Sequence, residues 1–214
     1  MKEKLNNMYK RMLSFFGPQN WWPADTPFEV MIGAILTQNT NWKNVEKAIN
    51  NLKEKGLLDI LKIHKISEQE LSLLIKPAGY FKIKAKRVKN LVSHIVKNYD
   101  ADLNNFFSLD TESLRCELLS IKGIGPETAD SILLYAAQRP IFVVDAYTFR
   151  IMKRHNMIWD DIGYDELQEL FMKNLPCDEQ LFNEFHALIV QTGKQFCKKK
   201  PVCKGCPLDG WPEK

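Results

Sequence analysis

Apolar residues recur at three- and four-residue spacing through almost the whole of this 214-residue chain. Such a period lines one face of an α-helix, whereas a half-buried strand would alternate apolar and polar residues. Residues 27–36 (PFEVMIGAIL) are apolar all round, which is typical of a helix enclosed by others. The nearest candidate for a strand, IFVV at 141–144, is short enough to be a buried connection. The pattern predicts an all-α fold with residues 27–36 at its centre.

Residues that start and stop helices flank these apolar stripes. Ser67 opens a capping-box pattern, Asp110 precedes a further helical stretch, and Pro126 suits a first helical turn. Gly56 and Gly193 stand where helices are expected to end. The residues typical of helix ends and the spacing of the apolar residues therefore both predict helices along the chain.

Two glycines stand one residue apart in KGIGPETAD, residues 122–130. We expect one helix to end at Lys122 and the next to start at Pro126. Glycine permits a positive φ and close approach to the backbone, and the amide groups at a helix start attract anions. A plain helix–helix turn is the alternative, but it needs one glycine more often than two. We therefore favour a turn that binds a DNA phosphate.

A single carboxylate, Asp145, follows the buried run 141–144. A carboxylate in this place either caps the helical stretch that begins there or works as an acid–base group. By itself, the residue favours the cap. The glycine turn and this carboxylate occur together in the chain, twenty residues apart.

Five motifs in the same order resemble the helix-hairpin-helix DNA glycosylases of the endonuclease III superfamily. They are PFEVMIGAILTQNT (27–40), AGYFKIKAKRVKNL (78–91), LLSIKGIGPETA (118–129), VVDAYTFR (143–150) and a C-terminal cysteine run. The resemblance implies a two-domain, all-helical fold with DNA and the extruded base in the cleft between the domains. The implied domains are a six-helix barrel, 25–138, with the hairpin at 118–136, and a second domain, 1–24 and 139–214, with a cysteine-rich loop at 197–206.

The resemblance also implies roles for individual residues. Asp145 becomes the catalytic aspartate, whose carboxylate stabilises an oxocarbenium-like sugar and orients or deprotonates the attacking water. Gln38 matches the residue that fills the gap left by the extruded base, and Tyr80 matches the wedge. A buried polar cap and a core aromatic are the respective alternatives. The hairpin residues expected to contact DNA are Lys122, Gly123, Ile124, Gly125 and Thr128.

Bifunctional members of the superfamily carry a lysine shortly after the hairpin glycines, and its amine forms a Schiff base with the sugar. Glu127 occupies that position here. Because a carboxylate cannot form an imine, the resemblance implies a monofunctional glycosylase that uses water. One alternative is an endonuclease III-like glycosylase and AP lyase for oxidised pyrimidines, with Lys122 as substitute nucleophile. A mismatch-specific glycosylase and a non-catalytic protein that binds damaged DNA are the others.

Two tryptophans and a proline precede the central helix, in NWWPADTPF at 20–28. Consecutive tryptophans cannot both face the core from one side of a helix, so we expect at least one at the surface. This element, and an aromatic residue after LTQNT, resemble the 3-methyladenine DNA glycosylase III branch, which also lacks the lysine. The resemblance implies alkylated purines such as 3-methyladenine as substrates, since a cationic ring stacks favourably on aromatic faces. The base-pocket candidates are Trp21, Trp22, Pro23, Trp42 and Lys194. Core packing of the tryptophans and a solvated lysine at a helix end are the alternatives.

Three cysteines lie in the C-terminal run CKKKPVCKGCPLDGWPEK. Cys197, Cys203 and Cys206 resemble part of the four-cysteine pattern that holds a 4Fe-4S cluster in many members, but the fourth position, near Pro212, has no cysteine. Asp209 or an external ligand could complete a cluster, three thiolates and another group could hold zinc, or the site could be a remnant. A cluster would be structural and would hold a basic loop against DNA.

The net charge of +4 at pH 7 and the lysines at 82–89 and 197–204 weakly favour an anionic partner, although a solvated helix face also explains them. No signal peptide or membrane span is visible in the sequence. We expect a cytoplasmic monomer that acts on double-stranded DNA containing damaged bases, away from membranes.

Cys116 and Cys177 are expected to be buried, although Cys177 could also be a distant ligand. The histidines, His186 among them, show no ligand spacing and are given no role.

Overall fold

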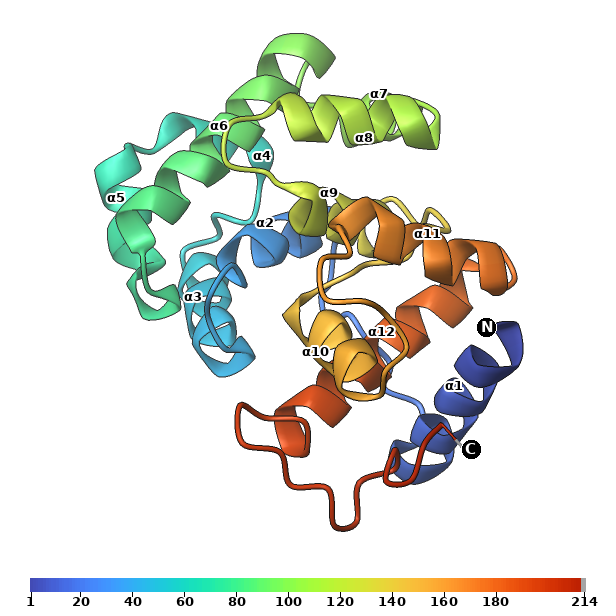
Figure 1. Cartoon of the computed structure of the whole chain (residues 1–214). Coiled ribbons are helices and arrows are strands. Elements are labelled where there is room, and N and C mark those ends of the chain that lie inside the picture. The colour runs from blue at the N-terminus through green and yellow to red at the C-terminus, as the bar shows by residue number, and fades with distance from the viewer. Residues whose placement is uncertain (213–214) are drawn as a thin grey trace. The chain divides into compact units, whose positions relative to one another are not determined.

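The computed structural model describes residues 1–212, in which helices are joined by turns and loops without a β-strand (Figure 1). The all-α prediction is confirmed. The chain divides into two compact units, one of Met1–Pro23 with the chain from Arg139 onward, the other of Ala24–Gln138. Among the described residues, no helix combines the length and apolar character needed to cross a membrane.

The unit of Ala24–Gln138 is built around the helix predicted to be enclosed. Its elements are α2 (Pro27–Leu36), α3 (Trp42–Glu54), α4 (Ile60–Lys65), α5 (Glu68–Leu74), the 3-10 turn η1 (Lys76–Ala78), α6 (Phe81–Tyr99), α7 (Leu103–Phe107), α8 (Thr111–Ser120) and α9 (Pro126–Tyr135). Every residue of α2 after Pro27 is buried, and α2 contacts α3, α6 and α9. The side chain of Thr26 caps α2 by accepting from the Glu29 N–H at 3.2 Å. The all-round apolar pattern is therefore satisfied by neighbours on several sides.

The other unit places a buried connection next to the candidate active site. Its helices are α1 (Lys2–Phe16), α10 (Ala146–Arg154), α11 (Tyr164–Asn174) and α12 (Glu179–Gln195). α1 packs beside α12, as Figure 1 shows. Residues 141–144 run through the core without forming a strand, and the ring of Phe142 stacks on Phe171 with centroids 4.1 Å apart. This confirms the buried connection, which leads directly into Asp145 at the start of α10.

Most of the predicted helix ends are confirmed. Ser67 and Asp110 cap α5 and α8, and Gly56 follows the end of α3 with φ of +62°. The hairpin's first helix, α8, ends at Ser120, two residues before the predicted Lys122.

Two other expectations are wrong. Gly193 lies inside α12, where a Cβ would overlap the Tyr147 ring, so close packing of α10 on α12 explains this glycine. Cys116 and Cys177 are exposed, because each lies on the solvent side of its segment.

Candidate functional site

Asp145 is the N-cap residue of α10 and uses its two carboxylate oxygens differently. Oδ1 accepts hydrogen bonds from the backbone N–H and the hydroxyl of Thr148, both at 2.8 Å. Oδ2 lies 3.7 Å from Nε2 of His186 on α12. The cap predicted from the sequence is therefore present, and it engages one oxygen while the other faces an imidazole.

The surroundings of Asp145 favour its ionised form. Burial raises the pKa of this carboxyl, but the nearby imidazole of His186 and the two hydrogen bonds from Thr148 together lower it below its ordinary value. A carboxylate with a lowered pKa carries its negative charge at neutral pH. Such a charge, held in a buried setting, can stabilise a cation that forms next to it.

His186 is a site residue that the sequence analysis missed. It is 8% exposed, and α12 brings it next to Asp145, although the helices α10 and α11 lie between the two residues in the chain. A signal was present in the sequence: His186 follows Phe185 within a stripe of core residues, where a polar side chain requires a partner. The partner's identity depended on how α10 and α12 pack.

Lys194, predicted for the base pocket, also lies near Asp145. Desolvation lowers the pKa of its ammonium group, and the charge of Asp145 acts in the opposite direction. The residue is exposed overall, so its head group is accessible while neighbouring atoms reduce its hydration. The ring of Tyr147 packs against Gly193, the residue before Lys194. Burial and the charge of Asp145 raise the pKa of Tyr147. One unit therefore gathers Asp145, His186 and Lys194.

The three tryptophans predicted for the base pocket lie outside the core. The rings of Trp21 and Trp22 are 5.0 Å apart, both residues are partly exposed, and Pro23 is exposed. The prediction that at least one of the paired tryptophans reaches the surface is confirmed. Trp42, in the other unit, is the first residue of α3 and is also partly exposed. Stacking on a ligand remains a prediction for these side chains.

The fold requires glycine at only one of the two hairpin positions. Gly123 has φ of +102°, and a Cβ there would overlap the side chain of Arg87. Gly125 has φ of −101°, which any residue adopts, and a Cβ would meet nothing within 4 Å. Gly125 is the N-cap of α9, and no side chain caps that helix. Lys122 and Gly125 are exposed, whereas Ile124 anchors the turn in the core. The absent side chain at Gly125 therefore leaves the start of α9 open to a ligand.

Gln38 is tied to the hairpin. Its Nε2 donates to the carbonyl of Gly123 at 3.2 Å and to the hydroxyl of Thr128 at 2.9 Å. Its Oε1 accepts from Nη1 of Arg87. The side chain of Thr128, 6% exposed, is thus engaged with Gln38. This network holds the segment after α2 against the turn that carries both glycines.

Tyr80 stands out from the surface of its unit. Its side chain is 69% exposed, which excludes the alternative of a core aromatic. Its backbone is left-handed, with φ of 45° and ψ of 31°, immediately before α6. Bulky residues rarely adopt this conformation, so the surrounding structure must hold it in place.

The cysteine run does not match the requirements of a 4Fe-4S cluster. Such a cluster takes four cysteine thiolates, and the run contains Cys197, Cys203 and Cys206. Within residues 1–212, no group of three or more His, Cys, Asp or Glu side chains is arranged to hold a metal ion. Cys197 is buried, and its Sγ accepts a hydrogen bond from Arg154 at 3.2 Å. Trp211, which precedes Pro212 in the chain, is buried beside His155.

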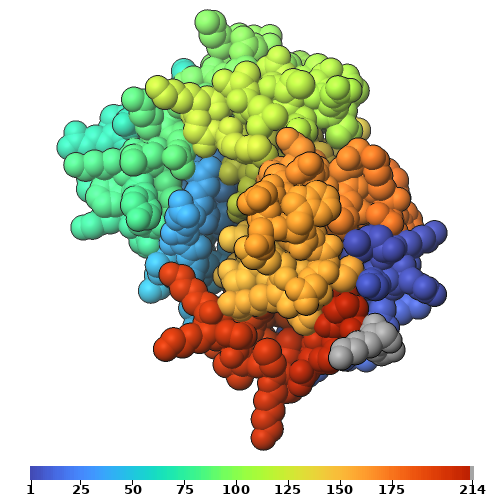
Figure 2. All heavy atoms as spheres, viewed as in Figure 1, coloured from blue at the N-terminus to red at the C-terminus, as the bar shows by residue number. Residues whose placement is uncertain are grey.

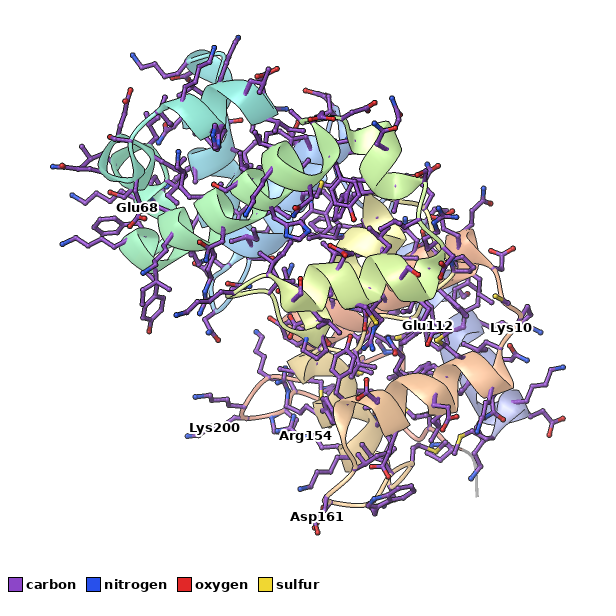
Figure 3. All side chains as sticks on the ribbon, turned by 90° about the horizontal axis from the view of Figure 1, so that it is seen from above. Lys10, Glu68, Glu112, Arg154, Asp161 and Lys200 are labelled. Atoms are coloured by element: carbon purple, nitrogen blue, oxygen red, sulfur yellow. The ribbon has the colours of Figure 1, made fainter. Side chains whose placement is uncertain are left out.

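Basic side chains hold this loop instead. Arg154 donates to the carbonyls of Lys198 at 2.6 Å and Lys199 at 2.9 Å, and Arg150 donates to that of Cys197 at 2.6 Å. Figure 3 shows Arg154 next to the loop and Lys200 projecting from it, and Figure 2 shows the loop's side chains, in red, standing out at the surface. Further along, Arg11 donates to the carbonyls of Pro207 and Asp209. The loop therefore has protein partners along its length.

We predict that the paired changes Cys203→Ser and Cys206→Ser leave the melting temperature almost unchanged. Arg154→Ala should lower the free energy of unfolding by about 1 to 3 kcal/mol, because it removes charge-assisted hydrogen bonds to backbone carbonyls. Denaturant unfolding of the three proteins, with metal analysis of each preparation, provides the measurement. Loss of folding in the serine variant, together with bound iron or zinc in the wild type, would contradict the prediction.

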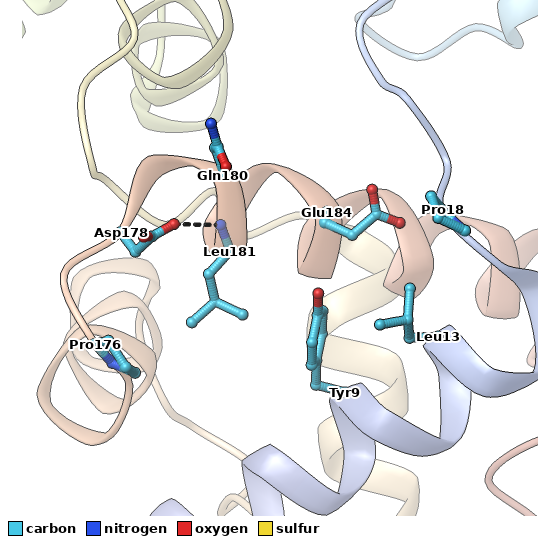
Figure 4. Close-up of a pocket in the computed structure, with 8 residues that line it drawn as sticks. All are labelled: Tyr9, Leu13, Pro18, Pro176, Asp178, Gln180, Leu181 and Glu184. Carbon is cyan, nitrogen blue, oxygen red and sulfur yellow. Dashed lines mark hydrogen bonds between the residues drawn. The ribbon is translucent and has the colours of Figure 1, made fainter.

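A pocket of about 480 Å³ lies away from these residues, in the unit that contains α1 and α12 (Figure 4). It is lined by Tyr9, Leu13, Pro18, Pro176, Asp178, Gln180, Leu181 and Glu184. Asp178 caps α12 by accepting from the Leu181 N–H, and Glu184 accepts from the Gln19 N–H, each at 2.7 to 2.8 Å. Since the carboxylates serve the fold, we assign this pocket no function.

Residues 32–177 match the HhH-GPD superfamily of base excision DNA repair proteins. A Methanocaldococcus jannaschii protein, provisionally named a DNA repair glycosylase, is 53% identical over 207 residues, covering 96% of this chain and 94% of the relative. Endonuclease III of Thermotoga maritima is 30% identical over 196 residues, covering 89% of this chain and 84% of the relative.

Two solved structures have a similar fold. The H. pylori 3-methyladenine DNA glycosylase bound to 1,N6-ethenoadenine has a TM-score of 0.77 and 32% identity, covering 91% of this chain and 97% of that chain. An endonuclease III in a non-covalent DNA complex has a TM-score of 0.83 and 23% identity. The match covers 97% of this chain and 93% of that chain. The chain therefore belongs to the HhH-GPD superfamily, a family of helix-hairpin-helix DNA glycosylases of base excision repair.

Proposed function

We propose that this protein is a monofunctional DNA glycosylase that hydrolyses the N-glycosidic bond of alkylated purines, such as 3-methyladenine, in double-stranded DNA. The observation that carries the proposal is the buried, ionised carboxylate of Asp145, with Oδ1 engaged by Thr148 and Oδ2 turned toward His186. This arrangement presents a fixed negative charge of the kind that stabilises a sugar cation.

The proposed reaction proceeds by hydrolysis. The bond between the sugar C1′ and the base nitrogen breaks, and its electron pair leaves with the base. Because 3-methyladenine is cationic in DNA, it departs as a neutral molecule and needs no added proton. Asp145 stabilises the positive charge on the sugar, water adds its oxygen to C1′, and the proton passes to Asp145 or to solvent.

Glu127 supports the monofunctional part of the proposal. It lies at the second position of α9, where the resemblance to bifunctional relatives would require lysine, and it is exposed. A carboxylate has no nucleophilic amine, so it cannot form the Schiff base that precedes strand cleavage. Water remains the attacking group in this proposal.

The choice of alkylated purines is supported by the exposed aromatic side chains and by one relative. Trp21, Trp22 and Trp42 are all partly exposed, and aromatic faces attract a cationic ring by about 0.5 to 2 kcal/mol per contact. The similar H. pylori enzyme was solved with a modified adenine, 1,N6-ethenoadenine. We propose that the tryptophans, with Pro23 and Lys194, contact the damaged base.

Base release from three kinds of DNA tests the proposal. Methylated, oxidised and mismatched duplexes are incubated with the protein, and released bases are separated by chromatography. We expect release of 3-methyladenine. Release of oxidised pyrimidines with strand nicking would instead favour an activity like that of endonuclease III, to which the chain is 30% identical in Thermotoga maritima. Absence of any base release would contradict a glycosylase.

The two hairpin glycines provide a second test, directed at DNA binding. Gly125→Ala fits the free protein without strain but adds a methyl group where we propose that a phosphate binds. We expect its free energy of unfolding to change by less than about 1 kcal/mol and its DNA affinity to fall about tenfold. Fluorescence anisotropy with a labelled duplex measures that affinity. Wild-type affinity in this variant would show that no phosphate approaches Gly125.

Gly123→Ala is the matched comparison at the same turn. It places a side chain at positive φ and against Arg87, so we expect the free energy of unfolding to fall by about 2 to 4 kcal/mol. The two variants therefore separate the glycine required by the fold from the glycine proposed for DNA. We further propose that the enzyme acts as a monomer in the cytoplasm, on double-stranded DNA containing damaged bases, and that any cluster bound by its C-terminal cysteines would be structural.

A further inference from the structure

We propose that Lys84 is a positioning residue for DNA penetration, whose buried side chain ties together the two segments that carry Gln38 and Tyr80. This inference rests on the proposed function, in which Gln38 and Tyr80 enter the duplex. Lys84 lies on α6 and is 1% exposed, which places it among the largest fully buried side chains of the described chain.

The ammonium group of Lys84 makes two hydrogen bonds. Nζ donates to the carbonyl of Leu36 at 2.8 Å and to that of Ala78 at 2.9 Å. Leu36 is the last residue of α2, and Ala78 is the last residue of η1. A cation at the end of α2 also meets the negative pole of the helix dipole. One side chain thereby joins two elements far apart in the sequence.

Each of these carbonyls lies two residues before a residue proposed to enter DNA. Leu36 precedes Gln38, and Ala78 precedes Tyr80. Lys84 also holds Tyr80 from the other side, since its backbone N–H donates to the Tyr80 carbonyl at 3.0 Å. Lys84 therefore bonds the carbonyl of Ala78 through its side chain and that of Tyr80 through its backbone, while the side chain of Tyr80 projects outward.

A lysine in this place has an energetic disadvantage. Burial, and next the charge of Arg87, lower the pKa of Lys84 to about 8. The charged form of this side chain is therefore less favourable here than it would be in water. Methionine would occupy a similar volume without this penalty, but it would leave the carbonyls of Leu36 and Ala78 without the donor that they share. A purely structural role in packing therefore does not require lysine, whereas fixing two backbone carbonyls does.

The next turn of α6 supports the same segment. Arg87 donates to Oε1 of Gln38 and packs against Gly123. Lys84 thus fixes the backbone before Gln38, and Arg87 contacts its side chain. Both contacts lie within the unit of Ala24–Gln138.

A duplex containing a tetrahydrofuran abasic-site analogue, with 2-aminopurine opposite, tests the proposal. Insertion of protein side chains unstacks 2-aminopurine and raises its fluorescence. At saturating protein we expect a rise with the wild type and loss of most of that rise with Lys84→Met. Lys97→Met, which removes an exposed lysine in the last turn of the same helix, should keep the wild-type rise. Saturation removes differences in affinity, and circular dichroism confirms that each variant is folded.

Excision is measured separately on the best substrate of the wild type. Because misplaced groups slow a reaction that depends on geometry, we expect Lys84→Met to reduce the single-turnover rate by about tenfold or more. If Lys84→Met does not fold, Lys84→Gln, which retains a donor but no charge, replaces it with the same expected loss of fluorescence.

The abasic analogue contains no base, so the fluorescence test is independent of glycosylase activity. A wild-type rise that Lys84→Met abolishes supports the positioning role even if no base is ever released. Equal fluorescence for folded Lys84→Met and wild type overturns it, whether or not the protein excises bases. A wild type that causes no rise also overturns it.

Discussion

Asp145→Asn should reduce base release by about a thousandfold while DNA affinity and folding stay near wild type. Asparagine retains a side-chain oxygen that can accept from the Thr148 N–H, so the N-cap of α10 is preserved. The substitution removes the negative charge that faces the sugar cation. Single-turnover excision, DNA binding and thermal unfolding measured on the same preparation separate these effects.

Asp178→Asn is a matched control for this experiment. Asp178 also caps a helix in the same unit, with its Oδ1 accepting from the Leu181 N–H at 2.7 Å. The chemical change is identical, but Asp178 lines the pocket near Tyr9 and has no proposed catalytic role. We expect this variant to excise bases at the wild-type rate. Full excision by Asp145→Asn, or equal losses in both variants, would contradict the role of Asp145.

Glu127→Lys should convert the protein into one that borohydride traps covalently on DNA. The new amine would lie at the start of α9, where the resemblance to bifunctional relatives has its lysine. It can attack the sugar and form a Schiff base, which borohydride reduces to a stable adduct. We expect the adduct to increase at least about tenfold over the wild type on substrate or abasic duplex, detected by denaturing electrophoresis. The loss of a favourable acidic residue at a helix start should destabilise the fold by less than about 1 kcal/mol.

Glu127→Arg separates the amine from the charge. Arginine carries the same positive charge but cannot form an imine under these conditions. We expect no trapped adduct with arginine and wild-type levels of excision. Strong trapping by the wild-type protein would show that another lysine, with Lys122 the first to examine, already acts as a nucleophile. Equal behaviour of the lysine and arginine variants would show that position 127 does not reach the sugar.

The sequence was sufficient for the fold class because the relevant signals are local. The all-round apolar run predicted α2, and short polar residues predicted the caps of α5, α8 and α10, since a cap needs a partner only three residues away. Gly193 was misassigned because its reason is not local. The Tyr147 ring that excludes a Cβ there belongs to another helix.

The sequence indicated which residues to examine as the candidate site, but not which side chains would contact them. The position of Asp145 after a buried run predicted a cap, the resemblance to the glycosylases implied its catalytic role, and the hairpin glycines were identified by their spacing. The pairing of Asp145 with His186, the Arg87 side chain against Gly123, and the Lys84 bonds to Leu36 and Ala78 were not foreseen. Each of these contacts joins residues from different helices, and no periodicity in the chain specifies such a pair.

The sequence by itself determined that this chain forms helices, where several of them begin, and that it carries a carboxylate after a glycine hairpin without the lysine of lyases. These are properties of short segments, in which dihedral preferences and hydrogen bonds to residues three or four positions away dominate. Only the tertiary structure decided which polar and charged side chains lie close together. Packing of α10 on α12 brings an imidazole to Asp145, and packing of α6 on α2 buries an ammonium group, because electrostatic interactions depend on distance in space and on desolvation.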